Sequence, residues 1–85
     1  MSVEAIARSS HQIGRLVQRF RQEKGLTQTQ LAELAGQRQE MISKIETGQG
    51  GVKLATLFDV LAALGLEMAL GPRSHSSSTD IEDIF

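Results

Sequence analysis

The sequence contains no cysteine, which excludes disulfides and thiolate metal sites and is typical of a reducing compartment. Its two histidines, His11 and His75, lie in different regions, and no group of His, Asp and Glu has the spacing of metal ligands. We therefore expect neither a metal nor a cofactor. Long apolar runs are also absent, since nothing approaches the ~20 residues that span a bilayer and the N-terminus lacks a signal-peptide pattern. We expect a soluble protein of the cytoplasm.

Catalytic patterns are missing as well. No nucleophile with a nearby base, no paired carboxylates and no metal ligands are arranged for catalysis. The glycine-rich segment at residues 48–51 has neither the glycine spacing nor the preceding strand of a phosphate-binding loop. The sequence therefore favours a binding protein over an enzyme.

The middle of the chain carries strong helix signals. Thr27 followed by Gln30 is a capping-box pattern, which predicts a helix that starts at Gln28. Gly36 supplies the permissive backbone that ends this helix and opens a turn. The predicted apolar stripe of the helix, at i, i+3 and i+4, consists of Leu31, Leu34 and Ala35.

A second helix, over about residues 38 to 47, is predicted after the turn, with Gly48 as its terminating glycine. Its inward face consists of Met41, Ile42 and Ile45. Its other face is polar and consists of Arg38, Gln39, Glu40, Ser43 and Lys44. Two short helices joined by a tight turn, the second with an exposed polar face, are arranged as in a helix-turn-helix, whose second helix enters the DNA major groove.

Helical periodicity continues on both sides of this motif. A capping box at Ser9 and Gln12 predicts a helix over about residues 10 to 24, whose inward residues are Ile13, Leu16, Val17 and Phe20. A further helix over about residues 54 to 64 has the inward residues Leu54, Leu57, Phe58, Leu61 and Leu64. The sequence thus predicts an all-α domain.

After Gly65 the apolar residues alternate with a period of two, which predicts a short strand with the apolar residues Leu66, Met68 and Leu70. A lone strand has unpaired edges, and the same strand of a second subunit would pair with it across a two-fold axis. A chain of 85 residues has a marginal core, so a homodimer would add useful buried surface. The alternative is an irregular apolar segment that folds back on its own domain.

The net charge of −1 is divided unevenly along the chain. Residues 1–73 hold all nine Lys and Arg against seven acids, a net of +2, whereas residues 74–85 hold three acids and no Lys or Arg, a net of −3. A surplus of +2 is modest for a DNA-binding domain, so a single domain should bind weakly and with strong salt dependence.

These features divide the chain into an N-terminal extension (1–8), a helix-turn-helix domain (9–71) that ends in the dimer strand, and a tail (72–85). The tail is Ser-rich and then acidic, and it has too little apolar surface to fold alone, so we expect it to be disordered. It nevertheless ends in Ile84 and Phe85. This end is either a peptide that orders on a partner or a frayed terminus.

The helical segment resembles the Cro and phage-repressor (XRE) type of helix-turn-helix over about residues 9 to 66. The matching features are Gln28 at the helix start, Leu31-Ala32, Gly36, Ile42-Ser43 and Glu46-x-Gly48. The resemblance implies a lambda-repressor-like bundle of about four or five helices that binds double-stranded operator DNA. One departure is Gln37, where the family usually has an aliphatic residue packed in the turn.

In this motif the first residues of the second helix point at base edges. Arg38 can contact guanine O6 and N7, Gln39 suits adenine N6 and N7, and Glu40 can accept from cytosine N4 or, near phosphates, disfavour the wrong site. The resemblance likewise implies that Gln39, Glu40 and Lys44 face bases.

Other residues are expected to position the protein on the DNA backbone. The resemblance implies that Gln28 holds a phosphate and braces the recognition helix, and that Thr27 and Ser43 contact the backbone. Lys44 can reach either a base or a phosphate. Arg15 and Arg19 are expected to form an ordinary solvated face of their helix.

The resemblance also implies a structural ion pair between Arg21 and Glu46. Removal of one partner from such a pair would cost ~3 to 5 kcal/mol if the pair is buried. Its role would be structural, neither catalytic nor in reading DNA.

Within the family, the strand after the last helix and the tail are similar to the HipB-like antitoxins. This branch implies a dimer sealed by a two-stranded lid, here residues 66–70, that represses its own operon and binds a HipA-like serine/threonine kinase toxin. Ile84 and Phe85 would correspond to the apolar terminus that docks into the toxin. The alternatives are a free-standing repressor of phage or metabolic type and a protein-binding adaptor without an operator.

Overall fold

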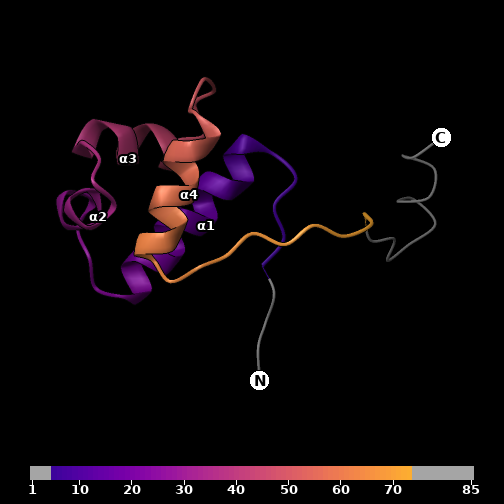
Figure 1. Ribbon diagram of the computed structural model, residues 1–85, viewed down its shortest axis with the longest axis horizontal. Coiled ribbons are helices and arrows are strands. Elements are labelled where there is room, and N and C mark those ends of the chain that lie inside the picture. Colours follow the sequence, from indigo (N-terminus) through magenta and orange to yellow (C-terminus); the bar gives the residue numbers. More distant parts are fainter. Residues whose placement is uncertain (1–4, 74–85) are drawn as a thin grey trace.

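The computed structural model describes residues 5–73, which form four helices around one core (Figure 1). They are α1 (Ser10–Glu23), α2 (Gln28–Ala35), α3 (Gln39–Glu46) and α4 (Leu54–Ala63). Helix α3 packs against both α1 and α2, and α2 also packs against α4. None of the helices among the described residues is long and apolar enough to cross a membrane.

The starts predicted for α1 and α2 are confirmed by their caps. The Ser9 hydroxyl accepts from the Gln12 amide at 3.1 Å. At α2, the Thr27 hydroxyl accepts from the Gln30 amide at 3.0 Å while the Gln30 side chain accepts from the Thr27 amide at 2.8 Å. This reciprocal pair satisfies two amides that the helix itself leaves unpaired. Gly36 ends α2 in the left-handed region, with φ 69° and ψ 32°.

Helix α3 is slightly shorter than its predicted range. Arg38 lies before the helix as its N-cap, in an extended conformation with φ −90° and ψ 153°, and Thr47 caps the other end. An arginine side chain cannot accept a hydrogen bond from the first helical amides, so no side chain caps α3 at Arg38. Helix α3 therefore begins with Gln39.

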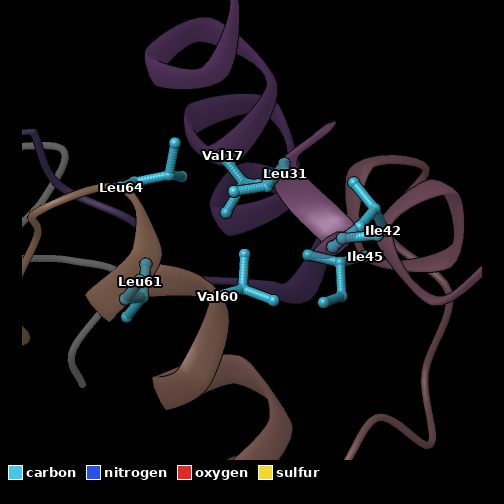
Figure 2. Packing of buried hydrophobic residues seen from close by; sticks show 8 residues of the cluster. Val17, Leu31, Ile42, Ile45, Val60, Leu61 and Leu64 are labelled. Atoms are coloured by element: carbon cyan, nitrogen blue, oxygen red, sulfur yellow. The ribbon is translucent and has the colours of Figure 1, made fainter. Parts of the chain in front are cut away.

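The core lies where the four helices meet (Figure 2). Its buried residues come from every helix and are Val17, Leu31, Ala32, Ile42, Ile45, Val60, Leu61 and Leu64. Full burial of one large aliphatic side chain contributes about 1.5 to 3 kcal/mol. The small core therefore supplies the main driving force for folding, and it fixes α3 against its neighbours.

Three residues predicted to face inward are exposed instead. Leu34 is 62% exposed, Leu54 is 60% exposed and Phe58 is 45% exposed. Periodicity identified wide apolar faces correctly, but the packing of α2 and α4 covers only part of each face. In α4 the covered part carries Val60 and Leu61, and the rest remains at the surface.

Helices α1 and α3 approach each other closely at Gly14. A Cβ atom at this position would lie 2.2 Å from the carbonyl oxygen of Ile45. Gly48, just after α3, has φ +79°, and a Cβ there would lie 2.8 Å from the Cα of His11. Only glycine permits these two contacts, and together they fix where the end of α3 sits on α1.

Residues 66–70 form no strand within this single chain, and no other strand occurs in residues 5–73. Leu66 packs partly against the core, whereas Met68 is 40% exposed and Leu70 is 95% exposed. Figure 1 shows that this segment leaves the helices after α4. The predicted pairing needs a second subunit and stays a prediction. Ile84 and Phe85, the predicted docking residues, lie outside the described residues.

Candidate nucleic-acid interface

A buried ion pair joins α1 to α3, the second helix of the helix-turn-helix. The Arg21 guanidinium of α1 donates from Nε to Glu46 Oε2 at 2.6 Å and from Nη2 to Glu46 Oε1 at 3.1 Å. The two side chains are only 11% and 2% exposed. Arg21 Nη1 also donates to the Leu26 carbonyl at 2.8 Å, which ties the loop before α2 to the same arginine. One guanidinium thus joins α1, α3 and the entrance of α2.

The ion pair extends to the surface through two glutamines. Gln28, the first residue of α2, donates from Nε2 to Glu46 Oε1 at 3.0 Å. Its own Oε1 accepts from Nε2 of Gln39, the first residue of α3. The starts of α2 and α3 are therefore linked by a continuous path of hydrogen bonds from the buried carboxylate. The resemblance implied a bracing role for Gln28, but no pattern in the sequence indicated its contact with Glu46.

The predicted base-reading residues lie together at the start of α3. Arg38, Gln39 and Glu40 are all exposed there, and Ser43 and Lys44 are partly buried further along the helix. Glu40 lies in the first turn, where the positive end of the helix dipole favours a carboxylate. This cluster offers both hydrogen-bond donors and hydrogen-bond acceptors at one exposed helix end, as direct readout of bases requires.

The remaining predicted contacts flank this cluster. Thr27 is exposed at the start of α2, where its hydroxyl already caps the helix. The Lys44 Nζ lies 3.8 Å from the position that a Cβ of Gly51 would occupy, so its ammonium group is beside the loop after α3. The Lys44 ammonium group is therefore separated from the start of α3 and lies on the side that leads into residues 48–51.

Gln37 makes a contact that the sequence did not reveal. Its side chain is partly buried in the turn, and its Nε2 donates to Oδ2 of Asp59 in α4 at 3.3 Å. The usual aliphatic packing of the turn is thus replaced by a polar link between the turn and α4. No local pattern connects positions 37 and 59, because α4 reaches the turn only through the tertiary packing of α2 on α4.

The exposed face of α1 has little role in holding this site. Arg19 lies 3.8 Å from Glu23 and 5.0 Å from the centroid of the Phe20 ring. Both charged side chains are more than half exposed, so the pair contributes little to stability.

Across residues 5–73, no cluster of His, Asp and Glu could hold a metal ion.

Comparisons with known proteins agree with this geometry. The helix-turn-helix family (HTH_3) matches residues 17–70. An uncharacterized HTH-type transcriptional regulator of Haemophilus influenzae is 44% identical over 52 residues, 61% of this chain and 53% of the relative. The match therefore spans about half of that relative's length. Antitoxin HipB of Escherichia coli K12 is 32% identical over 74 residues, 87% of this chain and 84% of HipB.

The fold is also similar to that of one chain in the solved structure of a HipA-HipB-O2-O3 complex. The matched chain has a TM-score of 0.75 and 32% sequence identity, and the match covers 81% of this chain and 97% of that chain. The four-helix arrangement, the exposed start of α3 and the family match together identify the motif. The chain belongs to the XRE-type helix-turn-helix family of DNA-binding regulators and is similar to the antitoxin HipB.

Proposed function

We propose that this protein is a sequence-specific repressor that acts as the antitoxin of a HipBA-like type II toxin-antitoxin operon. As a dimer it binds a palindromic operator, and it neutralises a kinase toxin. The observation that carries the DNA-binding part is the exposed cluster Arg38, Gln39 and Glu40 at the start of α3, in which Gln39 is connected through Gln28 to the buried carboxylate of Glu46. A rigidly held polar helix end is what base readout needs.

In this proposal the first residues of α3 read bases. Arg38 contacts guanine, Gln39 contacts adenine, and Glu40 accepts from cytosine or rejects wrong sites. Lys44, placed toward the loop after α3, is assigned to a phosphate. Lys44→Ala should then weaken binding to all DNA sequences alike. It should also reduce the slope of log affinity against log salt concentration by about one.

Backbone contacts complete the proposed interface. Thr27, Gln28 and Ser43 lie at the start of α2 and on α3, and they would fix the register of the domain on the duplex without reading sequence. Gln28 has one further N–H beyond the one given to Glu46, and this N–H is available to a phosphate oxygen.

The proposed dimer uses residues 66–70 as a strand paired with the same strand of a second copy. Met68 and Leu70 are exposed in the single chain, and an exposed apolar alternation is the pattern that such a ribbon would cover. A two-fold dimer requires half-sites about one helical turn, or a multiple of it, apart. The operator is therefore expected to be palindromic.

The proposed toxin partner rests on the similarity to HipB, whose solved structure contains HipA. Ile84 and Phe85 are proposed to dock into a HipA-like serine/threonine kinase. Two alternatives have specific tests. The first is a free-standing repressor of phage or metabolic type, which would bind its operator without a kinase partner. The second is a protein-binding adaptor, which would bind no operator and would tolerate changes at Arg38 and Gln39.

One experiment separates these functions. Full-length protein and a version that ends at Arg73 are each used in a pull-down, scored for a copurified kinase and for binding to the DNA upstream of the gene. If the full-length protein copurifies with a kinase and binds the DNA, the antitoxin function is supported. If the short version loses the kinase but still binds the DNA, the tail is assigned as the docking segment. DNA binding without a kinase in either form indicates a free-standing repressor. Absence of DNA binding would contradict the proposal.

A further inference from the structure

The buried carboxylate of Glu46 restricts how the amide of Gln28 can be oriented. An ionised carboxylate has only acceptors, and Glu46 Oε1 already accepts from Arg21 Nη2 at 3.1 Å. If the Gln28 amide were turned around, its oxygen would face the oxygen of Glu46. Only the orientation that points Nε2 at Glu46 makes a hydrogen bond there, and it does so at 3.0 Å. The oxygen of Gln28 must therefore point away from the ion pair.

The same restriction passes to the recognition helix. The oxygen of Gln28 faces Gln39, so Gln39 has to present its Nε2 and donate. One of the two N–H groups of Gln39 is consumed in this way. The exposed edge of Gln39 is left with one N–H donor and one oxygen acceptor in a fixed order.

This fixed edge distinguishes adenine from guanine. Adenine offers the N7 acceptor and the N6 amino donor, which match one N–H and one oxygen. Guanine offers two acceptors, N7 and O6, which would need both N–H groups of the glutamine. A glutamine free to turn can supply both, but a Gln39 held by Gln28 can supply only one. The hydrogen-bond path therefore favours adenine over guanine.

We infer that Glu46, which is buried away from the DNA-facing surface, sets the base preference of the protein by orienting the amides of Gln28 and Gln39 in turn. Glu46 and Gln28 are positioning residues for this readout. Their role in readout is additional to the structural role of the ion pair. The inference rests on the proposed function, because it requires Gln39 to read a base.

The test uses the full-length chain and a duplex library randomised over two helical turns. Selection with the wild-type protein identifies its preferred bases, and Gln39→Ala identifies the position at which Gln39 reads. The ratio of adenine to guanine affinity at that position is then measured for Glu46→Gln. Glutamine at 46 can accept or donate, so it no longer dictates the amide of Gln28. We expect the ratio to fall about ten-fold, as for one bidentate contact.

Two further variants separate readout from stability. Gln28→Met keeps the Arg21–Glu46 pair but removes the amide between Glu46 and Gln39, and it should lower the same ratio even if Glu46→Gln fails to fold. Val60→Ala opens the fully buried core without touching the hydrogen-bond path, and it should leave the ratio unchanged. In a Gln39→Ala background, Glu46→Gln should produce no further change at this position.

The outcomes distinguish the inference from the proposed function. An unchanged ratio in folded, DNA-binding Gln28→Met would overturn the inference and leave the proposed function intact. A fall of equal size in Val60→Ala would also overturn it, because general destabilisation would then explain the effect. If the wild-type protein selects no sequence from the library, the proposed function fails and the inference fails with it.

Discussion

Removal of the Glu46 side chain tests how strongly the buried ion pair holds the motif together. In Glu46→Ala the Arg21 guanidinium, 11% exposed, loses both hydrogen bonds to the carboxylate and keeps only the one to the Leu26 carbonyl. A buried charge left without its partner costs ~3 to 5 kcal/mol. The residual exposure lets some water reach Arg21, so we expect a loss near the lower limit, about 3 kcal/mol.

That loss is large for a chain of this size. A chain of 85 residues typically has a free energy of unfolding of about 4 to 13 kcal/mol. Urea denaturation followed by circular dichroism, at one fixed protein concentration, measures the change. With an m-value of about 1 kcal/mol per molar urea, the midpoint should fall by about 3 M. A fall corresponding to less than about 1 kcal/mol, as for an exposed pair, would refute the argument from burial.

The matched control replaces both partners. In Arg21→Met with Glu46→Met, two apolar side chains of similar length occupy the site and no charge is left buried. Such replacements are commonly neutral or stabilising by about 1 to 4 kcal/mol. The double variant should have a free energy of unfolding close to that of the wild type, whereas Glu46→Ala should not. This result would attribute the loss in Glu46→Ala to the unpaired charge of Arg21 and not to the missing side-chain volume.

Three further predictions follow from the described residues. Arg38→Ala and Gln39→Ala should each weaken operator binding by ~1 to 3 kcal/mol and relax discrimination at one base pair, measured by DNA-binding titration; unchanged affinity and selectivity in both would rule out the recognition-helix assignment. Gly14→Ala should destabilise the fold by about 1 to 3 kcal/mol, since its Cβ would lie 2.2 Å from a carbonyl oxygen, whereas Gly50→Ala, with nothing within 4 Å, should change stability far less; equal effects in denaturation would contradict the close packing. Leu70→Asp should preserve the circular dichroism spectrum, because this side chain is 95% exposed in the single chain. It should give a monomer in sedimentation analysis, because the charge would lie in the proposed dimer strand; a dimer of unchanged stability would place the interface elsewhere.

The hydrogen bonds from Arg21 to Gln39 help to fix the position of α3, which its own sequence does not determine. A short helix of eight residues has little stability alone, and its position depends on packing. The ion pair, the backbone contact at Gly14 and the core residues of α3 hold it from below. The start of α3 is therefore held in place, which would reduce the entropy cost of the proposed base contacts.

Local signals in the sequence were sufficient to predict the helices and most of their ends. The capping residues Ser9 and Thr27, the turn glycine Gly36 and the apolar periodicity each act within a few residues of the chain, so they can be read without knowledge of the fold. The exposed polar face of α3 could be predicted for the same reason. The Arg21–Glu46 pair was expected only from the resemblance to a family, because 25 residues separate its partners.

Tertiary packing decided what local patterns could not specify. Leu34, Leu54 and Phe58 satisfy helical periodicity but remain exposed, because the angle at which neighbouring helices pack determines how much of an apolar face is covered. The contacts from Gln28 to Glu46 and from Gln37 to Asp59 bring together residues 18 and 22 positions apart. The sequence thus determined the helices and the chemical character of their faces, whereas only the packing of the helices connected a buried carboxylate, through Gln28, to Gln39, which is proposed to read a base.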